Sequence, residues 1–262
     1  ERVSCLLAQQ VFCVSPSIRN VAIQDGVCPW PKAKVLCSGS INGVDAWGRF
    51  CLDRYSRSER EWLRAQHGLG KAEYILGFVG RVVRDKGVED LAAAWSTIQS
   101  EFPAAYLVII GPEESQDPVS PAVMKSLRED PRVIMLGRVE DPAPWYAVFD
   151  LVVLPTHREG FGMVLIEAAA MEVPVVATRI PGCVDAVQDG VTGTLVPPRD
   201  PESLAAAIRA YLKAPELRRR HGQAGRERVL REFRQEAIWE ALFQEYVRLL
   251  QEKGLPPPKP DQ

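Results

Sequence analysis

Six short runs of apolar residues, spread between Tyr74 and Pro197, most constrain what this sequence can fold into. They are mostly apolar throughout instead of alternating, which is typical of strands buried on both faces of a parallel sheet. Helical segments separate several of them, so the pattern predicts a doubly wound, Rossmann-like α/β domain. The strand runs are 74–80, 106–111, 133–137, 151–155, 174–178 and 193–197, and the helical segments are 88–102, 121–130, 161–172 and 201–214.

The two ends of the chain and the segment before Tyr74 carry weaker signals. Short strands are expected at 11–15 and near 34–37, with a helix starting directly after the first of them. Residues 46–72 are charged and irregular, apart from one amphipathic piece with Ser58 as its expected N-cap. The chain beyond Leu212 is predicted to be helical.

The loop after the first long strand holds two cations next to a helix start. Arg81 and Lys86 lie five residues apart, and Gly87 opens the helix. Because a helix N-terminus carries a partial positive charge, cations beside it favour a phosphate ligand. The loop has neither the G-x-G-x-x-G of a dinucleotide site nor the G-K-S/T of a P-loop. Two solvated surface cations explain the same residues equally well.

The stretch REGFGMVLIE places Glu159 and Glu167 on either side of a Gly-Phe-Gly turn. Gly160 and Gly162 allow backbone amides to approach a ligand closely, and a helix is expected to run from near Gly162 to before Pro174. Glu167 then lies on an apolar stripe, where an unpaired carboxylate is costly. The hydroxyls of a vicinal diol such as ribose could donate to its two oxygens. An arginine or backbone donors would satisfy it as well, and Glu159 alone also fits an ordinary first-turn glutamate.

Three further features carry weak signals. Residues 137–139 follow a strand near the same edge, where a base could pack against the backbone. His157 fits an incidental loop histidine better than a catalytic one. Segment 216–234 holds seven arginines and three glutamates, which is typical of a salt-bridged helical face, with attraction to an anionic membrane as the minor alternative.

The composition excludes several classes of protein. A formal net charge of −2 argues against nucleic acid as the main partner, and no apolar run reaches membrane-spanning length. The six cysteines form no C-x-x-C pair, so buried free thiols in a reducing compartment are expected. None of the three histidines has a metal-ligand spacing with a cysteine, so no metal site is predicted.

Several blocks in a fixed order resemble one enzyme family. They are GRVVRDKG, LGRVED, LVVLP, the paired glutamates with their GFG loop, AMEVPVVAT and GCVDAVQDGVTGTLVPPRDPESLAAAI. Over residues 35–235 the chain is similar to the group 1 glycosyltransferases, the retaining family 4 with the GT-B fold. The turn GSINGVD is similar to that of members that build capsular or lipid-linked polysaccharides in bacteria.

The resemblance implies transfer of a sugar from a nucleotide-sugar, most often a UDP-sugar, to a saccharide or lipid-linked acceptor, with retention and without a metal or other cofactor. Arg81 and Lys86 match cations that hold the diphosphate, and Glu159 matches a glutamate near the donor sugar; these three are the expected catalytic residues. Glu167 matches the ribose-binding glutamate. The remaining donor-binding positions are Arg138 and Val139 in the base-contacting turn, and Gly160, Phe161, Gly162, Met163 and Val164 in the loop contacting sugar and phosphate.

The family has two α/β domains, with the acceptor domain first, and this sequence matches the second. Residues 1–45 are expected to be a remnant of the acceptor domain and a linker, and 46–235 the nucleotide-sugar-binding domain. Residues 236–254 are expected to form a crossover helix, and 255–262 a disordered tail. The chain is therefore expected to be a fragment whose partner is the absent acceptor domain.

Two other functions stay open at this point. A noncatalytic nucleotide-sugar-binding or regulatory module would keep the same loops, whereas an NAD-dependent oxidoreductase is disfavoured by the missing glycine fingerprint. The expected location is cytoplasmic, with peripheral contact at the inner face of the membrane as an addition to it.

Overall fold

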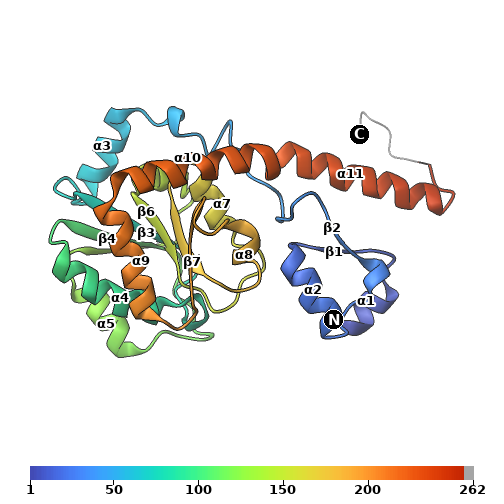
Figure 1. The fold of residues 1–262 in the computed structure, drawn as a ribbon, viewed down its shortest axis with the longest axis horizontal. Coiled ribbons are helices and arrows are strands. Elements are labelled where there is room, and N and C mark those ends of the chain that lie inside the picture. The colour runs from blue at the N-terminus through green and yellow to red at the C-terminus, as the bar shows by residue number, and fades with distance from the viewer. Residues whose placement is uncertain (257–262) are drawn as a thin grey trace.

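The computed structural model describes residues 1–256. The chain forms a large unit and a small unit, and a long helix extends from the large unit alongside the small one (Figure 1). The large unit is built on a six-stranded parallel sheet of order β5-β4-β3-β6-β7-β8. This confirms the predicted doubly wound sheet, and each strand end lies within one residue of its expected place. The strands are β3 (Tyr74–Val79), β4 (Ala105–Ile110), β5 (Val133–Gly137), β6 (Leu151–Leu154), β7 (Val175–Thr178) and β8 (Gly193–Val196).

Helices pack around this sheet because its central strands are apolar on both faces. Every residue of β6 and β7 is buried, so neither face can be left to solvent. Helix α4 packs against α9, and α7 packs against α10. The helices of the large unit are α3 (Arg57–Gln66), α4 (Val88–Glu101), α5 (Pro121–Glu129), α6 (Ala143–Tyr146), α7 (Met163–Ala170), α8 (Cys183–Ala186), α9 (Pro201–Lys213) and α10 (Pro215–Glu232), with 3-10 turns η2 (Leu52–Arg54) and η3 (Arg84–Lys86).

The small unit has little core of its own. Its α-helices bury no residue, and its strands form a separate two-stranded parallel sheet. Ser15 caps the second helix, where its Oγ accepts from Ile18 N–H at 3.2 Å. The elements are α1 (Arg2–Leu7), β1 (Val11–Cys13), α2 (Pro16–Gln24), η1 (Trp30–Lys32) and β2 (Ala33–Val35).

Helix α11 (Gln235–Glu252) extends from the large unit alongside the small one (Figure 1). Glu245 on this helix, whose side chain is only 12% exposed, pairs with Lys34 in β2. Arg248 lies 3.1 Å from Glu245 and donates to Gln10 at 3.3 Å. These polar contacts attach the small unit to α11.

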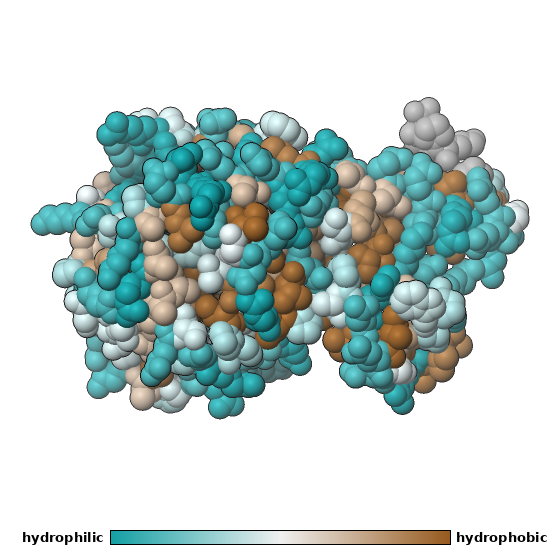
Figure 2. All heavy atoms as spheres, in the orientation of Figure 1, coloured by the Kyte–Doolittle hydropathy of each residue, from teal (hydrophilic) through white to brown (hydrophobic). Residues whose placement is uncertain are grey.

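One face of α11 is apolar and exposed. Trp239, Phe243 and Tyr246 recur at helical spacing and are each close to half exposed. Figure 2 shows further apolar atoms on the small unit and beside its junction with the large one. A group of exposed apolar side chains marks an interaction surface more often than scattered ones do.

The start of α3 differs from the prediction. Ser56, not Ser58, is the N-cap, and it forms a capping box in which its Oγ accepts from Glu59 N–H and the Glu59 carboxylate accepts from Ser56 N–H. Both serines are followed three residues later by a glutamate. The capping-box pattern alone could not choose between them.

The cysteines also depart in part from the prediction. All six are free thiols, but only Cys28, Cys51 and Cys183 are buried, and Cys37 is exposed. Cys37 lies in the turn after β2, which ends at Val35 instead of continuing to residue 37.

Three further predictions concern a membrane span, a metal site and the C-terminal end. No helix within residues 1–256 is both long and apolar enough to cross a bilayer. In the same residues, no group of three or more His, Cys, Asp or Glu side chains could hold a metal ion. Most of the tail predicted to be disordered, residues 257–262, lies outside the described range.

Candidate functional site

The predicted loops meet at the carboxyl edge of the large sheet. The strand order reverses between β3 and β6, since β4 and β5 continue on one side and β7 and β8 on the other. Open parallel sheets bind ligands at such a switch point, beyond the carboxyl ends of the strands. The loops after β3 and β6 carry Arg81, Lys86 and Glu159 and therefore flank this position.

Lys86 and Glu159 form an ion pair across the switch point. Lys86 Nζ lies 2.7 Å from Glu159 Oε2, and the two side chains are only 15% and 18% exposed. Gly160 N–H donates to the other carboxylate oxygen, Oε1, at 3.0 Å. Limited exposure reduces screening by water and salt, so this pair is held more firmly than an open surface pair. The fold thus joins two predicted catalytic residues that come from different loops.

Glycine at position 87 lets these two loops touch. Gly87 has a φ of 72°, in the left-handed region that favours glycine. A Cβ added there would lie 1.9 Å from the carbonyl oxygen of Pro155, the residue that follows β6. Any larger residue would push the β3–α4 loop away from the β6–α7 loop and separate Lys86 from Glu159.

Asp85 ties the same two loops together a second time. Its carbonyl oxygen accepts from His157 N–H at 2.8 Å and from Thr156 Oγ1 at 3.1 Å. The His157 ring is engaged as well, with Nε2 lying 2.7 Å from Asp90 Oδ2 in α4. His157 therefore connects the two loops to α4, whereas the sequence favoured an incidental loop histidine over a catalytic one.

Arg81 is placed differently from Lys86. Its Nη1 lies 2.8 Å from Glu114 Oε2, in the loop after β4, and half of its side chain is exposed. The two predicted cations therefore have separate carboxylate partners. Lys86 lies at the centre of the switch point, whereas Arg81 lies nearer to the solvent.

The partner of Glu167 is a tyrosine, neither the arginine nor the backbone donors expected from the sequence. Tyr146 in α6 donates its hydroxyl to Glu167 Oε2 at 2.8 Å. Burial raises the pKa of Glu167, while the Tyr146 hydrogen bond and the charge of Arg49 act in the opposite direction. Burial, followed by the negative charge of Glu167, raises the pKa of Tyr146 well above its usual range, so the phenol stays a donor. Tyr146 itself was the sequence signal for this contact, because the hydroxyl of a buried tyrosine usually has a hydrogen-bond partner.

The segment Gly160–Val164 presents backbone more than side chains. Phe161 is 1% exposed, and its ring packs edge-on against Phe233 with centroids 5.4 Å apart. Met163 and Val164 form the first turn of α7 and pack partly against the core. That turn contains no acidic residue, and first-turn N–H groups have no partner within a helix. The amino end of α7 is therefore suited to an anion.

The turn after β5 lies along the same edge. Gly137 has a φ of 64°, and its carbonyl oxygen accepts from Gly111 N–H at 2.8 Å. Arg138 is exposed, and Val139 is half-buried against the core. The turn offers a partly buried apolar side chain next to a cation, as a stacked base requires.

The small unit contacts the loop after β7 and helix α8, and that loop in turn lies against the β6–α7 loop. Ser17 Oγ accepts from Gly182 N–H at 2.8 Å, and Ser17 N–H donates to Asp185 Oδ2 at 3.2 Å. A Cβ on Gly182 would lie 2.7 Å from the carbonyl oxygen of Gly160. This junction could not be predicted from the sequence, because Ser17 and Asp185 are 168 positions apart.

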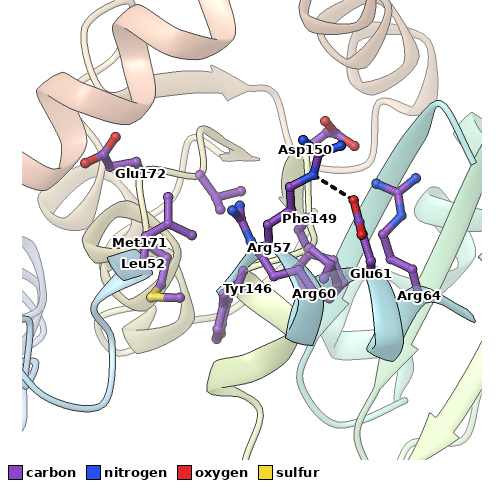
Figure 3. A pocket seen from close by; sticks show the side chains of 13 residues that line it. Leu52, Arg57, Arg60, Glu61, Arg64, Tyr146, Phe149, Asp150, Met171 and Glu172 are labelled. Atoms are coloured by element: carbon purple, nitrogen blue, oxygen red, sulfur yellow. Dashed lines mark hydrogen bonds and ion pairs between the residues drawn. The ribbon is translucent and has the colours of Figure 1, made fainter. Parts of the chain in front are cut away.

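A cavity of about 400 Å³ lies at the opposite, amino edge of the sheet, near Asp150 (Figure 3). Figure 3 shows that Arg57 on α3 pairs with Glu61, 2.7 Å away. None of the predicted site residues lines this cavity. The cavity therefore lies away from the predicted site residues. Tyr146 lines it and donates to the Glu167 carboxylate, and Met171 lines it and donates its N–H to the Glu167 carbonyl at 3.3 Å.

Comparison with known proteins agrees with the chemistry of the loops. The profile described as "Glycosyl transferases group 1" matches residues 73–214, more than half of the chain. The capsular polysaccharide biosynthesis glycosyltransferase CapM of Staphylococcus aureus is 33% identical over 252 residues, which cover 96% of this chain and 65% of CapM.

Solved structures show the same fold. Sucrose-phosphate synthase from Thermosynechococcus elongatus has a TM-score of 0.81 at 30% identity, over 96% of this chain and 61% of that one. Alr3699/HepE of Anabaena, solved in complex with UDP and glucose, has a TM-score of 0.80 at 23% identity, over 93% and 64%. The chain thus spans less than two thirds of each of these three proteins. It belongs to the group 1 glycosyltransferases, and its large unit is the Rossmann-like half of a GT-B fold.

Proposed function

We propose that the large unit binds a nucleotide-sugar, in the first place a UDP-sugar, at the carboxyl edge of its sheet. The observation that carries the proposal is the Lys86–Glu159 pair at the switch point. The amino end of α7, with no acid in its first turn, adds a second group suited to a diphosphate. The UDP in the HepE structure supports the choice of nucleotide.

Each predicted residue then has a role that follows from its place. Lys86 and the amides of Gly160–Val164 hold the diphosphate, and Glu159 lies beside the sugar to be transferred. Glu167 accepts hydrogen bonds from the ribose, and the Arg138–Val139 turn contacts the base. Arg81, nearer to the solvent, contributes attraction to the diphosphate at longer range.

Sugar transfer breaks the bond between the anomeric carbon and the diphosphate, which leaves negative charge on the nucleotide. Lys86 and the α7 amides are in place before that charge forms, so they stabilise it without reorganisation. We assign this neutralisation to protein groups and to no metal ion. We further propose a retaining transfer to a saccharide or lipid-linked acceptor in cell-surface polysaccharide synthesis, which the role of CapM in capsular polysaccharide biosynthesis supports.

The acceptor side is proposed to lie mainly outside this chain. We assign residues 1–45 to a part of the acceptor domain with its linker, 46–235 to the nucleotide-sugar-binding domain and 236–254 to the crossover helix. In support, the small unit buries little, and the exposed face of α11 carries Trp239, Phe243 and Tyr246. An acceptor domain would cover such surfaces.

Peripheral contact with an anionic membrane is a separate and weaker proposal for α10. Arg226 and Arg228 donate to backbone carbonyls, and Arg219 pairs with Glu216, so these arginines serve the fold first. Sedimentation with vesicles that contain phosphatidylglycerol would test the contact, and binding that is independent of the anionic lipid would contradict it.

Calorimetry with UDP, UDP-sugars and NAD tests the proposed site. UDP and at least one UDP-sugar are expected to bind and NAD is not, and the reverse order would favour an oxidoreductase. The alternative of a noncatalytic module needs a second assay, in which the chain is joined to an acceptor domain. Transfer that is lost in Lys86→Ala would support the enzyme, whereas tight binding without transfer would support the module.

A further inference from the structure

Tyr146 connects the carboxylate of Glu167 to the core of the large unit. Its side chain is fully buried, and its ring packs edge-on against Phe50 and Phe149, each with a centroid distance of 5.9 Å. Only its hydroxyl is polar, and that group donates to Glu167 Oε2 at 2.8 Å. Because close packing fixes the ring, the hydroxyl is a donor at a fixed point.

The carboxylate of Glu167 depends on this donor for its orientation. Within residues 1–256, Tyr146 provides the only hydrogen bond to it, and Oε1 receives none. The charged groups that face it, Arg49 and Asp141, are paired with each other at 2.8 Å. The terminal torsion of a glutamate is broad, so an unheld carboxylate samples many planes. The tyrosine removes that freedom and leaves one oxygen open.

We propose that Tyr146 is a positioning residue that sets nucleotide specificity by holding Glu167 with one oxygen free to accept from a ribose hydroxyl. A ribonucleotide satisfies that oxygen, whereas a deoxy analogue leaves it unpaired in a partly buried place, which costs affinity. The inference rests on the proposed ribose role of Glu167. It adds that the selection for ribose depends on a residue that does not touch the ligand.

Calorimetry on the wild type, Tyr146→Phe and Glu167→Gln tests this with UDP, 2′-deoxy-UDP and 3′-deoxy-UDP. In the wild type, UDP is expected to bind more tightly than at least one deoxy ligand. Tyr146→Phe should lower that preference and weaken UDP on the order of tenfold. Inorganic pyrophosphate lacks the ribose, so it should bind equally to the wild type and to Tyr146→Phe. A general structural loss would weaken pyrophosphate too.

The outcomes distinguish a wrong role for Tyr146 from a wrong ribose site at Glu167. If Glu167→Gln lowers the ribose preference and Tyr146→Phe does not, the role of Tyr146 is wrong and the ribose role of Glu167 stands. If neither variant changes it, the proposed ribose site itself is wrong. Should Tyr146→Phe fail to fold, Glu167→Asp withdraws the carboxylate from the phenol, and an unchanged preference there would equally refute positioning.

Tyr211→Phe is a matched control. Tyr211 is also fully buried, and its hydroxyl lies 2.7 Å from His221 Nδ1, in a different part of the large unit. Its loss removes buried hydrogen bonds to His221 and, at 3.0 Å, to Thr194. The melting temperature should fall at least as far as in Tyr146→Phe, whereas the ribose preference should stay at the wild-type value.

The pH dependence gives a second readout. The Tyr146 hydrogen bond lowers the pKa of Glu167 against the effect of burial, and Arg49 and Asp141 face the same carboxylate from the preceding loops. Removing the phenol should move that pKa up further. The ratio of wild-type to Tyr146→Phe affinity for UDP should therefore grow as the pH falls from 8 towards the raised pKa of Glu167, and the ionisation of UDP affects both proteins alike. A constant ratio counts against positioning.

Discussion

At the scale of single residues, the two predicted cations are not equivalent. Lys86 is mostly buried and faces Glu159, whereas Arg81 is half exposed and faces Glu114. Lys86→Ala should weaken UDP binding by about 2–3 kcal/mol, because it removes a charged donor and leaves the Glu159 charge near the diphosphate. Arg81→Ala should cost less than about 1 kcal/mol, as for an exposed ion pair. Calorimetry with UDP measures both.

Uridine is the control ligand for this comparison, since it lacks the diphosphate. Its affinity should be the same in the wild type and in both variants. Equal losses of UDP affinity in Lys86→Ala and Arg81→Ala would show that side-chain exposure does not determine how much each cation contributes to binding. A parallel loss of uridine binding would place Lys86 away from the diphosphate.

The Glu167 carboxylate should lower the stability of the folded chain and raise its affinity for UDP. Burial raises its pKa in the folded chain above the ordinary value of 4.5. A raised acid pKa means that the stabilising form is the protonated one, so stability is lost as the pH rises through the folded pKa. Glu167→Gln, which can still accept from Tyr146, should therefore melt at a higher temperature than the wild type at pH 8. The difference should shrink towards pH 5, as the wild-type carboxylate becomes protonated.

Thermal unfolding followed by circular dichroism, without nucleotide, measures this effect. The same variant should bind UDP more weakly, so stability and binding change in opposite directions. A lower melting temperature at pH 8, or a gain that is larger at pH 5, would contradict the assigned cost of burial.

The sequence could predict the centre of the site but not its supports. Lys86 and Glu159 could be placed along one edge in advance, because the carboxyl ends of parallel strands lie there and the family motif contains both residues, but the ion pair between them was not predicted. Tyr146 could not, because the side chain that reaches Glu167 depends on how α6 packs against α7. Apolar periodicity fixes which face of a helix is buried, and it does not fix that contact. The Arg81–Glu114 pair was not predicted either, because the conformations of the two loops decide which of their side chains meet.

At the scale of elements, the close approach of the β3–α4 and β6–α7 loops is the most sensitive point. Gly87→Ala puts a Cβ within 1.9 Å of the Pro155 carbonyl and places an L-residue at a φ of 72°. The left-handed backbone alone costs roughly 1–2 kcal/mol, and the clash adds to it. We expect a loss of about 2–4 kcal/mol in the free energy of unfolding, measured by urea denaturation.

Gly70→Ala is the matched control, because nothing lies within 4 Å of a Cβ there and its φ is not left-handed. Its free energy of unfolding should change by less than about 0.5 kcal/mol. If Gly87→Ala were as mild, the loops could separate without strain, and they would not hold Lys86 against Glu159.

The local sequence pattern is enough to predict some element boundaries and not others. The six strands of the large sheet could be placed within one residue, because apolar runs end at glycine, proline or charged residues. The start of α3 could not be placed, since Ser56–Glu59 and Ser58–Glu61 fit the same capping pattern. Glu61 pairs with Arg57 in the structure, which leaves the cap to Ser56.

At the scale of the whole molecule, the small unit depends on the large one. Its α-helices bury nothing, so its two strands have little apolar area of their own to hold them. The contacts of Ser17 with the loop after β7 and with α8 support one side, and Glu245 on α11 supports the other. Such a unit is expected to open locally at a lower free energy than the central strands of the large sheet.

Glu245→Ala tests this dependence, because it removes the shared partner of Lys34 and Arg248. Hydrogen exchange of the amides in β1 and β2 should accelerate on the order of tenfold, as for a loss of 1–2 kcal/mol, while the amides of β3 keep their rates. Glu240→Ala, an exposed residue on the same helix that pairs with Gln244, should change neither. Equal acceleration in β3 would mean that the two units open together. Unchanged rates in β1 and β2 would instead leave the Ser17 contacts as the main support of the small unit.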